Sequence, residues 1–292
     1  MNSGVLLALG AYLFWGLTPL FWKLLSDVPA VEQLAHRIVW SLPLLVVAAT
    51  ITRGIRRLGG VDRRGWARFL AGGLLLSVNW GVFVWAVASD RVVEASLGYY
   101  INPLVSVALG VAVLGERLRP KQWTAVGLAA AGVLYLALRL GEVPWVSLAL
   151  AFSFGLYGLL QKRHGAVGPW ASLGAEIMWL WPVALGAIVV WGVDGAGSFG
   201  SGAATTTWLL LTGPVTITPL LLFGAAARRI PLATIGLLQY LAPTMQLLLG
   251  VFAFGEPMPI ERLVGFVFVW VGVALYLWDL RTSPSADAMA PT

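Results

Sequence analysis

The feature that most constrains this chain is a succession of long apolar stretches, each about the length of a membrane-crossing helix. Hydrophobic residues make up 59% of the 292 residues and charged residues only 11%, whereas soluble domains carry about 25% charged residues. A helix needs about 20 residues to cross the hydrocarbon core of a bilayer. Apolar stretches of that order, separated by charged residues, prolines and glycines, cover ten ranges: 4–25, 32–51, 67–88, 95–115, 122–140, 144–161, 170–192, 207–226, 230–254 and 263–280. The sequence therefore predicts an all-α integral membrane protein with ten transmembrane helices.

The basic residues favour one end of this predicted bundle. If the N-terminus is inside, most lysines and arginines fall on a single side, in the segments 52–66, 116–121, 162–163, 227–229 and 281. Such an excess marks the cytoplasmic side, so both termini are predicted to be cytoplasmic, in a bacterial inner membrane. The tail 282–292 is predicted to be disordered. The net charge is +6, but the basic residues form no continuous patch. We therefore expect them to contact lipid head groups and not nucleic acid.

A short motif occurs once in each half of the chain, at a constant offset of 140 residues. YINP at 100–103 is matched by YLAP at 240–243, and Gly110, Gly115 and Glu116 are matched by Gly250, Gly255 and Glu256. Basic residues follow Glu116, whereas the segment after Glu256 has no net positive charge, so the copies are predicted to end on opposite sides of the membrane. A five-helix unit copied in tandem must invert, because five is odd. The sequence therefore predicts two inverted five-helix repeats, residues 1–141 and 142–281, around a central cavity.

Inverted repeats of this kind are characteristic of secondary transporters, which bind substrate near the midplane where the repeats meet. Pro103 and Pro243 end the two copies of YxxP and lie inside predicted helices. A proline inside a helix removes a backbone donor and clashes with the preceding turn. We expect these two kinks to flank the transport path and to flex during transport. The alternative is a pair of static packing kinks.

Polar side chains at membrane depth are the next candidates for the substrate site. Asn79, Glu176 and Gln239 all fall inside predicted helices. A carboxylate in hydrocarbon is costly unless it is protonated, paired or facing water, so Glu176 is a candidate proton site or substrate-amine contact; the alternative is an interhelical hydrogen bond. His36 can titrate near neutral pH. Arg37 is a candidate for holding a substrate carboxylate, and the alternative is snorkelling to head groups.

The chain has 15 tryptophans, and many of them fall at predicted interfaces, where indole rings prefer the head-group level. Other aromatic residues lie deeper in the predicted helices or in the repeated motif. We expect these to line a cavity for a flat or amphipathic solute, with aromatic packing alone as the alternative: Trp15, Trp80, Trp85, Tyr99, Tyr100, Trp179 and Tyr240.

Several kinds of chemistry have no signature in the sequence. There are no cysteines and only two histidines, His36 and His164, on opposite predicted sides. We find no nucleotide-binding P-loop, no HExxH and no Ser/His/Asp set. No metal site and no cofactor are therefore predicted, and the chain is predicted not to be an enzyme.

The motifs resemble the RarD-type branch of the EamA transporters, in the drug/metabolite transporter superfamily. The likeness covers residues 4–281, and the segments that carry it include YLFWGLTPLFWK at 12–23, EQLAHRIVWS at 32–41, EASLGYYINPL at 94–104, VTITPL at 215–220 and GLLQYLAP at 236–243. The resemblance implies ten helices in two inverted five-helix repeats around a central cavity, an architecture shared with the YddG-like amino-acid exporters. It also implies export of small organic solutes, with amino acids and drug-like compounds as the usual substrates.

The predicted function is that of a secondary transporter that exports small metabolites by alternating access, without a cofactor. Amino acids or related amphipathic solutes are the expected substrates. Proton antiport and facilitated diffusion both remain open. The alternatives are a flippase for a lipid-linked intermediate and, from a different class, a membrane-embedded enzyme. Helices 122–140 and 263–280, which contain Gly127, Gly132, Gly265 and Gly272, are expected to be packing elements.

The inverted topology predicts opposite labelling of two engineered cysteines, because the chain has none of its own. Arg117→Cys and Met258→Cys place a thiol after each copy of the motif. In intact cells a membrane-impermeant maleimide should label Met258→Cys and leave Arg117→Cys unlabelled until the membrane is opened. Labelling of both from the same face would contradict the inversion.

Overall fold

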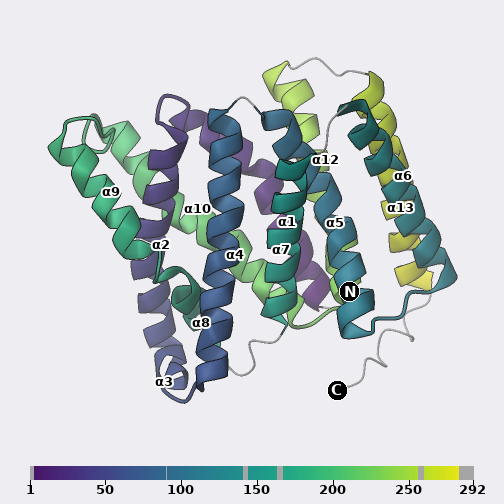
Figure 1. The fold of residues 1–292 in the computed structure, drawn as a ribbon, viewed down its shortest axis with the longest axis horizontal. Coiled ribbons are helices and arrows are strands. Elements are labelled where there is room, and N and C mark those ends of the chain that lie inside the picture. The colour runs from purple at the N-terminus through teal and green to yellow at the C-terminus, as the bar shows by residue number, and fades with distance from the viewer. Residues whose placement is uncertain (1–2, 90, 141–143, 163–166, 256–259, 283–292) are drawn as a thin grey trace.

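The structure is a computed structural model of the chain, and it describes residues 3–89, 91–140, 144–162, 167–255 and 260–282. These residues form helices joined by short connectors, and no β-strand occurs within those ranges (Figure 1). Glu256 and residues 283–292 of the predicted disordered tail lie outside the described residues, whereas Thr282, predicted to begin that tail, ends the last helix. The helices are α1 (Ser3–Trp22), η1 (Lys23–Leu25), α2 (Ala30–Ile51), α3 (Gly54–Leu58), α4 (Arg63–Ala88), α5 (Val92–Leu114), α6 (Pro120–Leu140), α7 (Trp145–Gln161), α8 (Pro169–Ile177), α9 (Trp181–Val193), α10 (Ala203–Ala227), α11 (Leu232–Gln239), α12 (Leu241–Leu248), η2 (Leu249–Ala253) and α13 (Ile260–Thr282).

Helices occupy all of the ranges predicted from the sequence, and most ranges hold one unbroken helix. By length and composition, six stretches suffice to cross a membrane: Ser3–Leu25, Ala30–Ile51, Arg63–Val87, Glu94–Leu114, Ala203–Ala227 and Leu232–Ala253. The bent pair α8 and α9 would make a seventh, and α7 and Leu263–Asp279 are shorter apolar helices. The chain is therefore an all-helical, multi-pass membrane protein. Ten crossings and the inversion of the two halves stay predictions.

Two of the predicted helices are broken, each one turn before a proline. The range 170–192 breaks between α8 and α9, which meet at an angle of 58°, and Pro182 is the second residue of α9. The range 230–254 breaks at Tyr240, ahead of Pro243, and continues into the π-helix η2. A proline clashes with the carbonyl four residues earlier and cannot donate to it. By contrast, α5 continues unbroken through Pro103.

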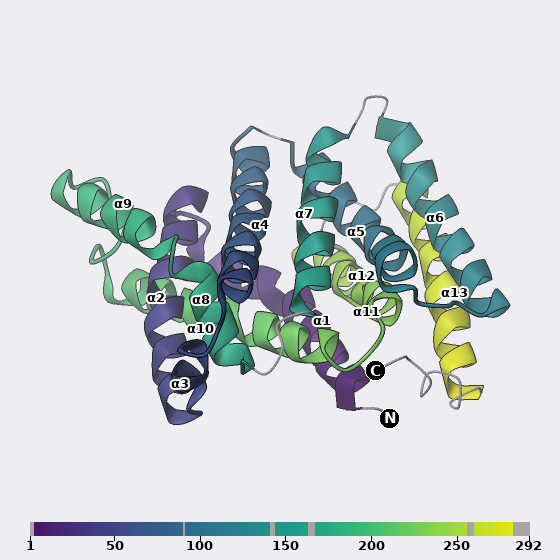
Figure 2. The ribbon, with the colours of Figure 1, turned by 60° about the horizontal axis from the view of Figure 1, so that its bottom comes forward.

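The helices of each half make their main contacts with helices of the other half. α1 packs against α10, α11 and α12, α7 packs against α4 and α5, and α2 packs against α8, α9 and α10. α6 and α13 pack together at one edge of the molecule, and α9 projects from the opposite edge (Figure 2). Neither half therefore buries its interior faces alone, and the two form a single helical body.

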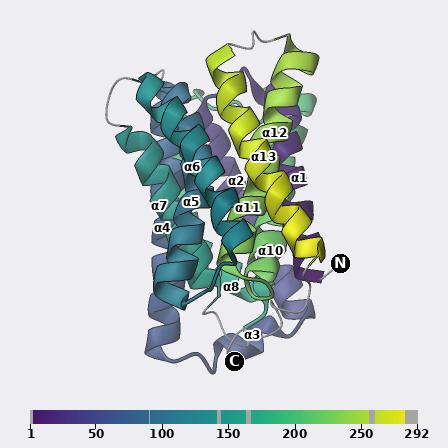
Figure 3. The same ribbon diagram turned by 90° about the vertical axis from the view of Figure 1, so that its right-hand side faces the viewer.

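Glycines allow α6 and α13 to approach backbone to backbone (Figure 3). A Cβ atom at Gly132 would lie 2.7 Å from the carbonyl oxygen of Gly265, and one at Gly272 would lie 2.6 Å from that of Ala125. Small residues at such contacts are the usual means by which membrane helices pack closely. The 140-residue offset exchanges the two contacts, because Gly132 corresponds to Gly272 and Ala125 to Gly265.

Enlarging either contact glycine should destabilise the protein. Gly132→Leu or Gly272→Leu forces α6 and α13 apart, and overpacking of this kind costs about 1–3 kcal/mol. Gly127→Leu is the matched control on α6, because a Cβ atom there meets nothing within 4 Å. The melting temperature of the purified protein in detergent should fall for both contact variants and stay near wild type for the control. Equal melting temperatures for all three would contradict the close packing.

Candidate functional site

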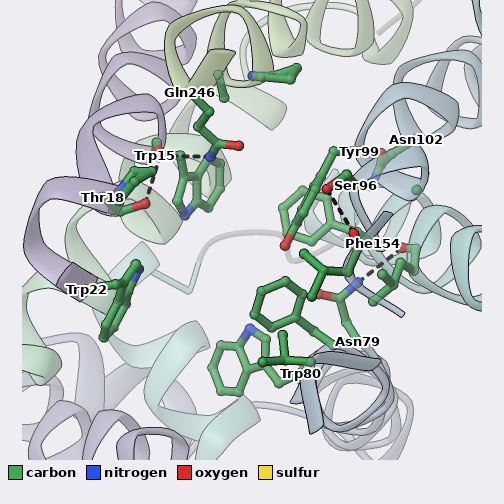
Figure 4. A pocket seen from close by; sticks show the side chains of 18 of the residues that line it. Trp15, Thr18, Trp22, Asn79, Trp80, Ser96, Tyr99, Asn102, Phe154 and Gln246 are labelled. Carbon is green, nitrogen blue, oxygen red and sulfur yellow. Dashed lines mark hydrogen bonds between the residues drawn. The ribbon is translucent and has the colours of Figure 1, made fainter. Parts of the chain in front are cut away.

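A cavity of about 930 Å³ lies between α1, α2, α4, α5, α7, α10 and the α11–α12 segment. On α1 and α4 the lining residues lie mainly in the second half of the helix, and on α2 and α5 they lie in the first half. It extends to one end of the bundle, where Lys23, Val92 and Phe254 line it. We call this end the cavity end. In the close-up, Trp15, Thr18, Trp22 and Gln246 face Ser96, Tyr99, Asn102 and Asn79 across the space (Figure 4).

Arg37 carries a positive charge on the cavity wall. Its Nε donates to the Thr216 hydroxyl at 3.0 Å, and its guanidinium carbon lies 5.0 Å from the Trp22 ring and 5.2 Å from the Trp80 ring. Both rings line the cavity and hold the guanidinium by cation–π contact. Among the described residues, no acceptor hydrogen-bonds the terminal amino groups of Arg37, and no carboxylate lies within ion-pair distance of it.

A second cation, Lys23, lies at the cavity end. Its Nζ atom is 4.1 Å from the centroid of the Phe254 ring. No aspartate or glutamate occurs among the described residues that line the cavity. The charged groups of the wall are therefore of one sign.

The neutral polar side chains of the cavity wall differ in how many of their hydrogen-bonding atoms have partners. Asn79 donates to the Leu150 carbonyl and to the Ser153 hydroxyl, both at 3.0 Å, which ties α4 to α7. Gln246 donates to the Trp15 carbonyl at 3.2 Å. The Oε1 atom of Gln239 is buried and has no hydrogen-bond partner among the described residues. Gln239 thus carries a buried acceptor without a partner in the wall of the cavity.

Aromatic rings close the cavity at its inner limit. Trp15 lies 5.7 Å from Phe154 and 5.9 Å from Phe223, centroid to centroid. Behind them Tyr157 stacks on Phe223 at 6.1 Å and 13°. Tyr12 donates from its buried hydroxyl to the Ile235 carbonyl at 3.1 Å. Beyond this floor the interior is packed.

The structure brings together eight of the residues singled out from the sequence. Those that line the cavity are Trp15, Arg37, Asn79, Trp80, Tyr99, Tyr100, Gln239 and Pro243. Other lining residues escaped the sequence reasoning: Thr18, Trp22, Lys23, Phe154, Thr216 and Gln246. A helical spacing from Trp15 could have found Thr18, Pro19 and Trp22, which follow it by three, four and seven residues.

The other singled-out residues lie away from the cavity. Tyr240 is 1% exposed and donates to the Tyr100 carbonyl at 3.0 Å. Trp85 is 44% exposed and packs on Trp145, with ring centroids 5.0 Å apart. Trp179 is 51% exposed, in the turn between α8 and α9.

Pro103 faces a neighbouring helix instead of the cavity. A Cβ atom at Gly236 would lie 2.6 Å from the Pro103 carbonyl oxygen. The glycine thus lets α11 rest directly on the backbone of α5.

Glu176 is fully buried between α7, α8 and α4. It accepts hydrogen bonds from the Tyr157 hydroxyl at 3.0 Å and from Gln161 Nε2 at 2.9 Å. A side chain at Gly73 would collide with the carbonyl oxygen of Glu176, so α4 and α8 touch backbone to backbone there. The carboxylate reaches the cavity floor only indirectly, because Tyr157 stacks on Phe223.

His36 is also buried outside the cavity. Its Nδ1 atom accepts from Trp40 Nε1 at 2.9 Å, and its Nε2 atom lies 3.8 Å from a Glu32 oxygen. The ring stacks on Phe199 with centroids 5.2 Å apart. These contacts anchor the segment after α9 to α2.

Glu116 joins the two halves at the opposite end of the bundle, which we call the basic end. Its carboxylate accepts from the backbone N–H groups of Leu232 at 2.6 Å and Ala233 at 2.9 Å, at the start of α11. Lys162 lies 3.5 Å from the same carboxylate and donates to the Ile230 carbonyl at 2.8 Å. Burial lowers the pKa of Lys162, and the charge of Glu116 opposes that shift.

Further contacts close the basic end. Arg228 donates to the Val167 carbonyl at 2.7 Å and to the Ser172 hydroxyl at 2.9 Å. Arg119 forms an ion pair with Asp279 at 2.6 Å. The bundle is thus hollow toward one end and tied by charged contacts at the other.

Known proteins are similar to this chain over nearly its whole length. The model of the EamA-like transporter family matches residues 2–138. Protein RarD of Streptomyces exfoliatus is 49% identical, over 100% of this chain and 95% of that protein. Uncharacterized transporter YojE of Bacillus subtilis is 44% identical, over 95% of this chain and 94% of that protein. The chain is a RarD-type member of the EamA transporter family.

A crystal structure with 21% sequence identity matches this EamA transporter with a TM-score of 0.72, over 96% of this chain and 99% of the other. At that identity the likeness concerns the fold. As an EamA transporter, the protein moves a small molecule across a membrane and is not an enzyme.

Removing the charge of Glu116 should loosen the basic end. Glu116→Gln replaces a carboxylate that caps α11, and hydrogen bonds to a charged group contribute about 1.5–3 kcal/mol. We expect a lower melting temperature in detergent. Asp194→Asn, an exposed carboxylate after α9, is the control and should melt like wild type. If Glu116→Gln melts no lower than the control, the carboxylate is not a significant tie between the halves.

Proposed function

We propose that this transporter exports small organic metabolites, amino acids or related amphipathic solutes, across a bacterial inner membrane by alternating access. The observation that carries the proposal is the cavity of about 930 Å³, lined by aromatic, polar and basic side chains from helices of both halves. Pockets that bind small solutes are of this size and have mostly apolar walls with a few polar groups. The cavity ends at an aromatic floor within the bundle, as a midplane site would.

Symmetric contacts support two inverted repeats as the moving parts. The contact of Gly132 with Gly265 and that of Gly272 with Ala125 are exchanged by the 140-residue offset of the motif. The two motif tyrosines, Tyr100 and Tyr240, meet through a hydrogen bond. Paired contacts of this kind are expected where two copies of a unit face each other across a twofold axis.

The distribution of basic residues supports an orientation. The ties at Glu116, Lys162 and Arg228 occupy the end that carries the basic connectors, which we assign to the cytoplasm, as we do both termini. The cavity end then faces outward. In this conformation a solute would leave to the outside while the cytoplasmic end stays closed.

For the cavity to open toward the cytoplasm, these contacts at the basic end must break. Glu116 holds α11, and α11 is separated from α12 by the break at Tyr240. The break and the π-helix η2 interrupt the regular hydrogen-bond ladder. We propose that α11 pivots there when Glu116 releases it, opening the cytoplasmic end.

Glu176 is the proposed site of proton coupling. Its carboxylate is fully buried, accepts hydrogen bonds from the neutral groups of Tyr157 and Gln161, and lies in the field of the positive charge of Arg228. Tyr157 stacks on Phe223, which contacts Trp15 of the cavity floor. A change in the protonation of Glu176 would therefore reach the cavity through this stack of rings.

Transport in proteoliposomes tests the function and the coupling together. The purified protein should move radiolabelled aromatic and branched amino acids or related amphipathic solutes faster than empty liposomes do. Under proton antiport, an imposed pH gradient should accelerate accumulation; under facilitated diffusion, it should not. No flux for any solute in a broad panel would contradict the proposed function.

Glu176→Gln should abolish the acceleration by the gradient and leave downhill exchange of solute intact. Glu32→Gln is the control, because Glu32 is another buried carboxylate but bonds to Ser198 near the cavity end. Acceleration that survives in a folded Glu176→Gln protein would remove Glu176 as the coupling site.

A further inference from the structure

We infer that the cavity selects solutes that carry a carboxylate and that Arg37 is the residue that holds it, so that amphipathic organic anions bind better than matched amines. This inference rests on the proposed function, because it takes the cavity as the place where the solute binds. It extends that function by assigning the sign of the charge on the solute and the side chain that binds this charge.

The hydrogen-bonding state of Arg37 is the first observation. A guanidinium group offers five N–H donors in one plane. Thr216 takes the donor on Nε, and the Trp22 and Trp80 rings flank the group. Since no acceptor among the described residues takes the terminal amino groups, they are left for a ligand. Two parallel N–H groups of an arginine match the two oxygens of a carboxylate.

The missing counter-charge is the second observation. A charge inside a membrane protein is costly unless it is paired or hydrated. The buried carboxylates that begin α2 and α5 pair with other groups, since Glu94 pairs with Arg91 through Oε1 and Glu32 accepts from Ser198. With Lys23 as the other charged group on the described wall, the cavity has a positive potential. Such a potential concentrates anions and repels amines.

The remaining wall defines the body of the solute. Trp15, Trp80, Tyr99 and Phe154 offer flat apolar surfaces. The unpartnered oxygen of Gln239 accepts one N–H or O–H group of a ligand. The chemistry that fits is a small aromatic or branched acid with one neutral donor. An amino acid satisfies the carboxylate part of this description but brings an ammonium group that no carboxylate on the described wall would pair with.

A matched series of ligands tests the inference by isothermal titration calorimetry of the purified protein in detergent. The probes share a phenyl ring and a three-carbon chain: 3-phenylpropionate is an anion, phenylalanine a zwitterion and 3-phenylpropylamine a cation. We expect affinity to fall in that order, with the anion binding about 10-fold or more tightly than the amine, as one charge-assisted bond provides.

Substitutions at Arg37 assign the preference to this residue. Arg37→Gln should weaken binding of 3-phenylpropionate by about 10-fold or more and leave the amine unchanged or bound more tightly. Arg37→Lys keeps the charge without the planar fork and should retain part of the preference. Arg56→Gln removes an exposed arginine from α3, far from the lining, and should bind all three probes like wild type.

The outcomes separate this inference from the proposed function. Equal affinities of the wild type for the three probes, or an anion preference that persists undiminished in a folded Arg37→Gln protein, would overturn the role of Arg37. Solute flux that is the same in Arg37→Gln as in the wild type would support the transport function and contradict the role of Arg37. If 3-phenylpropionate binds in an Arg37-dependent manner but no solute shows any flux, the binding site is supported and the proposed export is contradicted.

Discussion

Hydrogen bonding of the backbone in hydrocarbon is the constraint on which this structure depends. No water is available there, so every N–H and C=O group must be satisfied within the protein. This favours helices wherever the chain is apolar, and it limits what a proline can do. At both broken helices the turns retain hydrogen bonds: Leu180 donates to the Ile177 carbonyl, Tyr240 to that of Leu237 and Thr244 to that of Tyr240. The chain can therefore bend at these points without exposing bare backbone groups, which is what a moving membrane protein requires.

Polar and charged side chains follow the same constraint and thereby divide the bundle into two unlike ends. At the basic end, Glu116 bonds to backbone N–H groups of the opposite half, and Lys162 and Arg228 bond to carbonyls of their own half, which closes the path. At the cavity end, Arg37 and Lys23 rest on aromatic rings instead of carboxylates. Contacts of the first kind are stable until a competing interaction replaces them. Contacts of the second kind leave N–H donors free, so a solute can provide the acceptor oxygens that the protein does not.

The candidate site shows how far residue type alone can lead. Arg37, Asn79 and Trp80 are polar or amphipathic groups at membrane depth, and they line the cavity. Glu176 and His36 satisfy the same criterion, but they bond to neighbours within the packed interior. Trp85 and Trp179 point outward. A polar or aromatic residue inside a membrane helix needs a partner, and the sequence does not say whether that partner is a ligand, another helix or a lipid.

The sequence by itself determined that the chain is helical and membrane-embedded, where its helices lie, and that a motif recurs at an offset of 140 residues. These properties follow from local sums of hydropathy and from the positions of proline, glycine and charge. Only the tertiary structure decided which face of each helix meets the cavity, and that Trp22, Lys23, Thr216 and Gln246 belong to it. The physical reason is that lipid tails are as apolar as a protein core. A helix in a membrane therefore carries little amphipathic pattern to distinguish its inward face from its outward one.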